Sequence, residues 1–169
     1  ITQDNAGVSV ARNNGLHNAN GSLIMFLDAD DNYTTPYAIT NIYNRLKLTG
    51  ADMCVCNFTH PCFETYLDEG VYDLTKKDQF LAYYQDFFTY GMPWNKLTKR
   101  ECFTEDFVRG VKFTEDELFN LDNLHNIKRV AVINDVYHNY FCAPYNPKAK
   151  ASAVNSIYSA DKFWEKKST

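Results

Sequence analysis

The sequence predicts an α/β domain, and two observations carry that prediction. Two helical patterns are each followed by a stretch typical of a strand, at residues 22–27 and 51–58. The chain has 169 residues, 45% of them hydrophobic and 22% charged, which suits one soluble domain with a sizeable core. Helix followed by strand, twice over, is typical of a mainly parallel sheet flanked by helices.

The first half of the chain supplies those four elements in order. A helix is expected from Val8 to about Ala19, with Gly21 as its stop. Residues 22–27, of which 23–27 are all apolar, are typical of a short strand buried on both faces. A second helix opens at Thr35 with proline in its first turn, and Gly50 ends it before the strand at residues 51–58.

The second half is expected to hold shorter elements. Short strands are predicted at residues 63–67 and 70–74, and late strands at 130–134 and 136–141. Thr75 with Asp78 resembles a capping box, and Thr114 with Glu117 forms a second one. Helices follow both caps, the second over residues 115–128. Residues 144–169 are expected to be a polar tail that frays, or the start of a following segment.

Composition excludes several classes of function. The net charge of −4 offers no basic surface, so no nucleic acid partner is expected. The longest purely apolar run, residues 23–27, is far shorter than the roughly 20 residues of a membrane span. Five cysteines are an odd number and favour reduced thiols over a disulfide framework. A zinc site at Cys54, Cys56, His60 and Cys62 is the less favoured alternative to small buried side chains.

The acidic cluster that ends the first apolar run carries the strongest chemical signal. Asp28, Asp30 and Asp31 follow the strand directly, where open α/β sheets bind ligands. Carboxylates this close repel one another unless a cation sits between them, and oxygen ligands select Mg²⁺ or Mn²⁺ bridging to substrate phosphates. A polar turn is the alternative. An EF-hand is excluded, because Tyr33 and Ile39 stand where its glycine and glutamate belong.

Two further enzyme classes place acids in this way. A haloacid-dehalogenase-type phosphatase has the same Asp-x-Asp, but Asn32 departs from its usual pattern and no later acidic motif follows. A nucleotidyltransferase or sugar-phosphate enzyme stays open on this cluster alone.

A longer pattern resembles family 2 glycosyltransferases of the GT-A fold. The stretch QDNAGVSVARNNGLHNANGSLIMFLDADD matches it in order and spacing, and PWNKLTKRECF and GVKFTEDELF resemble a second signature downstream. The resemblance implies that residues 1–143 are part of a catalytic domain. It also implies that a first strand, a nucleotide-binding loop and a D-D-G-S-like segment belong before Ile1, so that the GT-A fold is N-terminally incomplete in this chain.

The resemblance assigns roles to the acid cluster and its neighbours. Arg12, Asn13 and Asp28 would bind a nucleotide-sugar donor, most often a UDP-sugar, while Asp30 and Asp31 would hold Mn²⁺ or Mg²⁺. The acceptor would be a glycan or a lipid-linked hydroxyl, as in surface polysaccharide synthesis. The expected location is the cytoplasm, with the inner face of the membrane as an alternative. A degenerate domain that only binds glycan or a partner is the non-enzymatic alternative.

The tetrapeptide FTED occurs twice, at residues 103–106 and 113–116. Only the second copy is followed by an apolar helical stripe, so the first is expected to be a loop. The resemblance places the base of an inverting displacement at Asp116, with Glu115 beside it. Acids in the first turn of a helix can also serve the helix dipole alone. Trp94 and Lys96 are candidates for the acceptor site. The alternative for Trp94 is a half-buried core position, and Lys96 could instead lie near phosphate or cap a helix.

Overall fold

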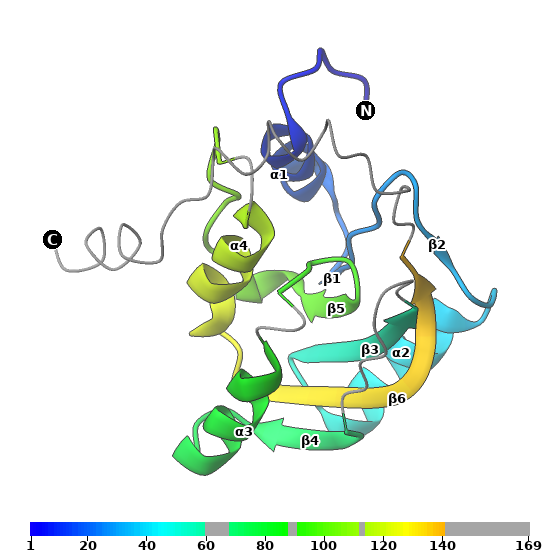
Figure 1. Ribbon diagram of the computed structural model, residues 1–169, viewed down its shortest axis with the longest axis vertical. Helices are drawn as coiled ribbons and strands as arrows, with labels where there is room; N and C mark the ends of the chain where they lie inside the picture. Colours follow the sequence, from blue (N-terminus) through cyan, green and yellow to red (C-terminus); the bar gives the residue numbers. More distant parts are fainter. Residues whose placement is uncertain (60–67, 88–90, 112–113, 141–169) are drawn as a thin grey trace, which may run out of the picture.

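The computed structural model describes residues 1–59, 68–87, 91–111 and 114–140, with the backbone alone for 84–87. Its strands are β1 (Leu23–Ile24), β2 (Asn32–Tyr33), β3 (Met53–Thr59), β4 (Gly70–Asp73), β5 (Lys96–Lys99) and β6 (Arg129–Asn139). These six form one sheet in the order β1-β5-β3-β6-β2, and β4 pairs with β6 as well (Figure 1). The long strand β6 holds β4 along its first half and β2 at its end.

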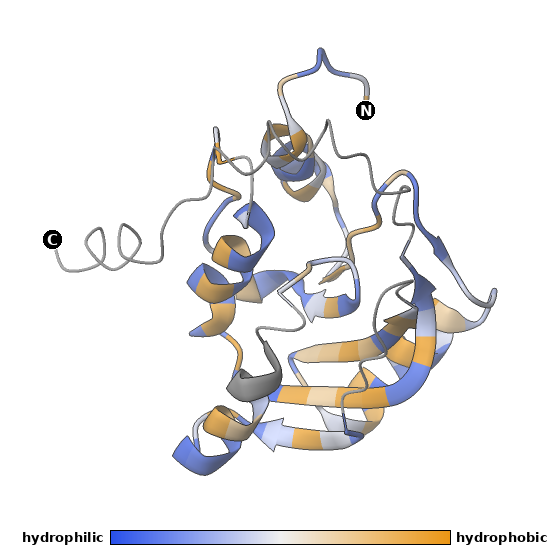
Figure 2. Cartoon of the chain, viewed as in Figure 1, coloured by the Kyte–Doolittle hydropathy of each residue, from blue (hydrophilic) through white to orange (hydrophobic). Residues whose placement is uncertain are grey.

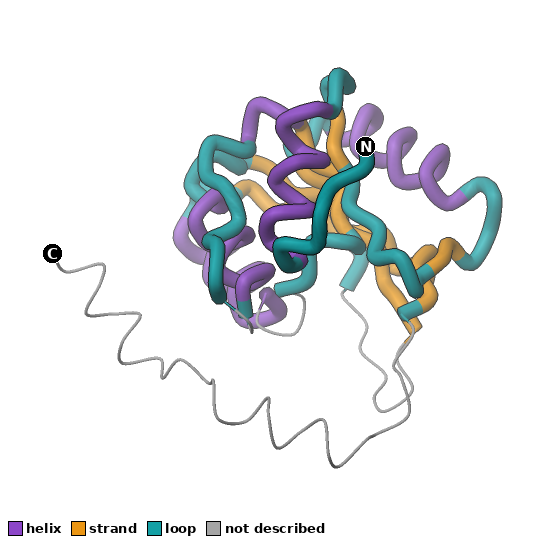
Figure 3. The backbone as a smooth tube through the Cα atoms, turned by 90° about the horizontal axis from the view of Figure 1, so that it is seen from above, coloured by secondary structure: helices purple, strands orange, loops and turns teal. Residues whose placement is uncertain are grey.

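Helices cover both faces of this sheet. They are α1 (Val8–Asn18), α2 (Ala38–Thr49), α3 (Lys77–Phe87) and α4 (Glu115–Leu124), and a short 3₁₀ turn η2 spans Arg100–Cys102. Successive side chains of a strand face opposite sides. Cys54 and Cys56 of β3 therefore pack with α2, while Met53 and Val55 pack with α3 and α4 residues. Figure 3 shows strands lying between helices, and Figure 2 shows apolar residues concentrated along β3 and β6.

The α/β class is confirmed, but the sheet is mixed rather than mainly parallel. Of the pairings among the described strands, only β3 with β6 is parallel. Strand β5 enters between β1 and β3 and runs antiparallel to both. It follows that β1, β3 and β6 share one direction, and their carboxyl ends meet at one edge of the sheet. That edge also receives the start of β5.

Several local predictions were right in kind and wrong in detail. The strand predicted at 22–27 pairs only through Leu23 and Ile24, and Leu27 is 47% exposed. The late strands at 130–134 and 136–141 are one strand, β6, with register shifts opposite Asn57. Gly50 ends α2 as expected, with a left-handed backbone at φ 62°. Helix α4 ends at Leu124, four residues before the expected Lys128.

Both predicted capping boxes are wrong. The Thr75 hydroxyl donates to Asp73 at 2.6 Å instead of turning to the helix that follows. Thr114 has a left-handed backbone at φ 62°, whereas a capping hydroxyl requires an extended one. The predicted strand at 63–67 and the polar tail at 144–169 lie outside the described residues. Within the described ranges, no helix is long and apolar enough to cross a membrane.

Candidate active site at the carboxyl edge of the sheet

The candidate site residues gather at the edge where β1, β3 and β6 end. Asp28 to Asp31 follow β1, and Trp94 to Lys96 lie where the antiparallel β5 begins. Helix α1 and the first turn of α4 lie beside this edge, and Figure 1 shows the two helices as neighbours. Strand direction thus explains how segments from opposite ends of the sequence meet here.

Arg12 joins three of these segments. From α1, its Nη2 donates to both carboxylate oxygens of Asp28, at 2.9 and 3.1 Å, and its Nη1 donates to Oε1 of Glu115 at 3.1 Å. The side chains of Arg12 and Glu115 are each only 11% exposed. The guanidinium also lies 5.3 Å from the ring centre of Phe107. Arg12 therefore fixes the acidic turn against the start of α4, where the proposed base stands.

Asn13 supports the same junction from the next position of α1. Its side-chain amide donates to the carbonyl of Phe107 at 2.9 Å and accepts from the Phe107 N–H at 2.8 Å. Asn13 is buried, and Phe107 stacks on Phe119 of α4 with ring centres 3.8 Å apart. The amide predicted to bind the donor thus secures the loop in front of α4.

The three acids of the turn have different surroundings. Asp28 is partly buried and paired with Arg12. Asp30 is exposed, and its side chain has no ion pair within the described part of the chain. Asp31 is buried with its side chain 1% exposed, and its Oδ2 lies 2.8 Å from Nε2 of His138. The acids predicted to hold one metal, Asp30 and Asp31, are therefore turned to solvent and to the core respectively.

Glu115 and Asp116 open α4, as the apolar stripe after them predicted. Burial raises the pKa of Glu115 and nearby Asp116 raises it further, while Arg12 acts to lower it. Asp116 accepts the N–H of Glu117 at 2.9 Å. It also lies close enough to Lys96 to favour that residue's charged form. The first turn of α4 thus holds two carboxylates with separate cations, Arg12 for one and Lys96 for the other.

Trp94 and Lys96 lie in the core. Trp94 is 2% exposed, and its ring stacks on His138 at 4.0 Å and on Tyr140 at 5.3 Å. Lys96 Nζ donates to Asn95 Oδ1 at 2.7 Å, and burial lowers the pKa of Lys96 to about 7. Neither side chain offers a surface to an acceptor, so their assignment to an acceptor site does not fit this burial.

His138 is the residue that sequence reasoning missed. It lies in β6, its side chain is 0% exposed, and it contacts both the acidic turn and Trp94. Burial lowers the pKa of His138, and the hydrogen bond with Asp31 opposes this. One pattern in the sequence could have indicated its burial. His138 lies in a predicted strand close to two aromatic residues, Tyr137 and Tyr140.

Among the described residues, Asp30 is the carboxylate of the acidic turn that is exposed and forms no ion pair, so a divalent cation fits this edge there. No group of three His, Cys, Asp or Glu side chains suited to a metal is found among the described residues. Mg²⁺ can instead be held by one carboxylate and substrate phosphates, and exposed Asp30 can supply that carboxylate. Cys54 and Cys56 are buried, and burial raises the pKa of each thiol to about 12, which suits small core side chains. His60 and Cys62 of the zinc alternative lie outside the described residues.

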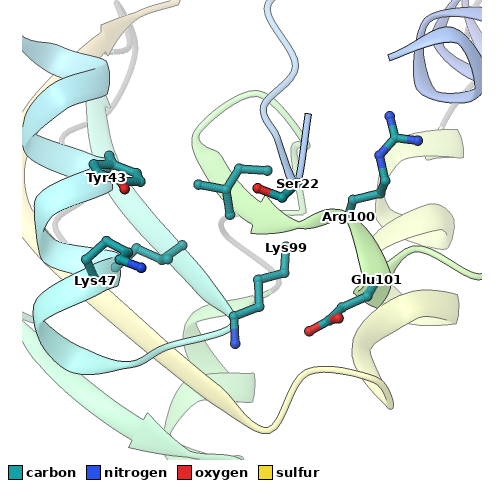
Figure 4. Close-up of a pocket in the computed structure, with 8 residues that line it drawn as sticks. Ser22, Tyr43, Lys47, Lys99, Arg100 and Glu101 are labelled. Carbon is teal, nitrogen blue, oxygen red and sulfur yellow. The ribbon is translucent and has the colours of Figure 1, made fainter. Parts of the chain in front are cut away.

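A separate pocket of about 410 Å³ lies at the other end of β1. Figure 4 shows Tyr43 and Lys47 of α2 facing Lys99 and Glu101 across it. Lys99 is paired with Asp52 at 2.7 Å. This pocket takes no residue from the acidic turn or from α4.

Comparisons with known proteins give the family and the fold of the chain. The sequence pattern described as "Glycosyl transferase family 2" matches residues 1–113. The chain is 28% identical to a cholesterol galactosyltransferase of Borreliella burgdorferi, over 83% of this chain and 43% of that protein. It is 31% identical to the glycosyltransferase GlyA of Streptococcus pneumoniae, over 71% of this chain and 19% of that protein. The chain therefore spans less than half the length of these relatives.

The fold has a solved counterpart. The structure of S. aureus TarS 1–349 in complex with UDP-GlcNAc matches with a TM-score of 0.67 at 16% identity, covering 94% of this chain and 44% of that one. At this identity the likeness concerns the fold, which is the GT-A fold expected from the sequence. The chain contains part of that fold.

Proposed function

The chain belongs to glycosyl transferase family 2, and from that premise we propose that it serves to transfer a sugar from a nucleotide-sugar donor to a hydroxyl acceptor, with inversion. The supporting observation is the contact of Arg12 with both Asp28 and Glu115. This contact brings the turn that would face the donor diphosphate beside the helix that carries Asp116. Donor and base would then meet at one edge, as a direct displacement requires.

The proposed roles follow from the surroundings of each carboxylate. Asp116 would accept the proton of the acceptor hydroxyl while that oxygen attacks the anomeric carbon, and a single displacement inverts the configuration. Glu115, held by Arg12, orients the helix start. Asp28 and Arg12 lie on the donor side, and Asp30 would hold a divalent cation. When bound, that cation would neutralise charge developing on the diphosphate leaving group.

The donor is proposed to be a UDP-sugar. One matching structure contains UDP-GlcNAc, which makes this compound the first donor to try. The acceptor is proposed to be a glycan or lipid-linked hydroxyl, and the name of one relative, a cholesterol galactosyltransferase, supports a hydroxyl on a lipid. The cytoplasm or the inner face of the membrane stays a prediction from the sequence.

The test is turnover of a panel of UDP-, GDP- and dTDP-sugars, UDP-GlcNAc first, with Mn²⁺ or Mg²⁺. It should use the protein as the cell makes it. We expect release of nucleotide from one donor, lost on addition of a chelator and in Asp30→Ala. Asp68→Ala, which removes an exposed carboxylate that is not among the candidate site residues, is the matched control. Donor binding without turnover would support a degenerate binding domain, and turnover that survives Asp30→Ala would contradict the role of Asp30.

A further inference from the structure

Asp31 forms a buried pair with His138 directly beneath the acidic turn. The Oδ2 to Nε2 distance is 2.8 Å, and the two side chains are 1% and 0% exposed. A carboxylate has no proton to donate, so Nε2 of His138 is the donor. The other ring nitrogen, Nδ1, is buried without a hydrogen-bond partner in the described part of the chain. The hydrogen bond with Asp31 is thus what satisfies this ring.

The pair is braced on two sides. Trp94 stacks on the imidazole with ring centres 4.0 Å apart and an interplanar angle of 14°, and Phe58 packs edge-on to Trp94 at 4.7 Å. Strand β2, which begins directly after Asp31, pairs with the end of β6 so that Tyr33 lies opposite His138. Backbone pairing and a buried side-chain contact therefore hold the same turn.

Adjacent Asp30 is in the opposite situation, exposed and without an ion pair among the described residues. We propose that His138 is a positioning residue, and that the Asp31–His138 pair, braced by Trp94, anchors the turn that presents Asp30. Asp31 is then an anchor and not a cation ligand. The inference rests on the proposed function only for the meaning of Asp30, since the anchor itself is a matter of structure.

The physical reason for an anchor is the charge density of the turn. Asp28, Asp30 and Asp31 fall within four positions, and like charges at short range repel. Arg12 compensates Asp28 from one side. The imidazole N–H of His138 donates a hydrogen bond to Asp31 in the core. Removing one partner of such a hydrogen-bonded charge is costly. Asp30 is left in a defined position to face solvent or a ligand.

Four variants separate an anchor from a ligand. Asp31→Asn keeps an oxygen that can accept the Nε2–H, whereas Asp31→Ala removes it. His138→Gln keeps an N–H donor, whereas His138→Phe keeps a ring over Trp94 and loses the donor. Hydrogen exchange over residues 28–34, followed by mass spectrometry, reports the turn without any need for activity. Exchange should rise at least tenfold in Asp31→Ala and His138→Phe and stay within about threefold of wild type in the two conservative variants.

Binding supplies the second measurement. Calorimetry with UDP and Mn²⁺ on the whole protein should show Asp31→Asn within about fivefold of wild-type affinity, while Asp30→Asn loses at least twentyfold. Steady-state kinetics, with the donor that the nucleotide-sugar panel identifies, should show His138→Phe raising the donor KM more than it lowers kcat, with rescue in His138→Gln. Should His138→Phe not fold, the contrast between Asp31→Ala and Asp31→Asn decides.

Two results would overturn the anchor. One is an Asp31→Asn variant that loses UDP and Mn²⁺ as severely as Asp30→Asn, which would make Asp31 a ligand. The other is unchanged exchange over residues 28–34 in both Asp31→Ala and His138→Phe. A protein that turns over no nucleotide sugar would refute the proposed function and leave the exchange result to decide the anchor.

Discussion

The two FTED copies share four letters and almost nothing of their surroundings. In the first copy, Phe103 stacks on Phe119 at 5.2 Å, and exposed Asp106 pairs with exposed His17 at 2.7 Å. In the second, Glu115 is buried and paired with Arg12, and Asp116 lies near buried Lys96. The first copy is a loop and the second opens α4.

The difference shows that neighbours decide what a Glu-Asp pair can do. The first copy is part of the packing around α4, because a side chain of α4 binds its backbone, and the sequence pattern does not show this contact. Asn123 of α4 accepts the N–H groups of Thr104 and Glu105 at 2.8 and 3.0 Å. The loop copy thus depends on the helix that the other copy begins.

The largest expected effect on stability comes from removing the side chain of Asn123, which links α4 to the first copy. Asn123 is 1% exposed and also donates to the carbonyls of Glu105 and Phe119. Asn123→Ala removes hydrogen bonds from four backbone groups that are partly or fully buried, so we expect a loss of about 3 kcal/mol in the free energy of unfolding. Urea unfolding measures it. A loss below about 1 kcal/mol in Asn123→Ala would contradict the account.

The next largest difference is expected between the glutamates of the two copies, in the stability that each loses on mutation to alanine. Glu115→Ala takes one carboxylate from Arg12 and leaves a mostly buried guanidinium with Asp28 alone, at a cost of about 2 kcal/mol. Glu105→Ala, its matched control, removes an exposed side chain and should change stability by less than about 0.5 kcal/mol. Equal losses in parallel urea titrations would show that the two copies are energetically alike.

The cation beside Asp116 predicts a pH dependence. The pKa of Lys96 is about 7 when folded, whereas an unfolded lysine holds its proton to about pH 10. The unfolded chain therefore binds more protons between these values, and Lys96 makes stability rise with pH there by up to about 1.4 kcal/mol per unit. Lys96→Met should lack this contribution. Unfolding free energies of both proteins from about pH 6 to 10 give the difference, and parallel curves would refute it.

The smallest effect is expected at the first copy's own ion pair. His17 and Asp106 are 59% and 50% exposed, so water and salt screen their attraction. A double-mutant cycle with His17→Gln and Asp106→Asn should give a coupling energy below about 0.5 kcal/mol, falling further at high salt. A coupling above about 1 kcal/mol would mean that this pair has a structural role like that of Arg12 and Glu115.

Much of the fold was readable because local signals agreed with the final structure. The stop at Gly50, the run before Asp28 and the strand around Cys54 and Cys56 each follow from spacing and burial. The order of acids after β1 pointed to the edge of the sheet that holds the candidate site. The different structures of the two FTED copies were also foreseen, because an apolar helical stripe comes after the second copy alone.

The remainder depends on contacts between distant segments. No local pattern shows that β5 inserts antiparallel between β1 and β3. The burial of Asp31 depends on His138, which lies 107 positions away. Thr114 reads as a cap but adopts a left-handed backbone. The insertion of β5 and the burial of Asp31 both depend on pairing between strands that are distant in the sequence, and local sequence patterns do not encode such pairing.

The most direct test of the central claim is Asp116→Asn beside Asp106→Asn in the protein as the cell makes it. The amide introduced by Asp116→Asn would keep the shape of the side chain and lose the basic carboxylate. We expect donor affinity, measured by calorimetry, to stay within about threefold in both variants. Sugar transfer should fall about 10²–10⁴-fold in Asp116→Asn alone. Transfer within tenfold of wild type in Asp116→Asn, or an equal loss in Asp106→Asn, would contradict the claim that the second copy carries the base.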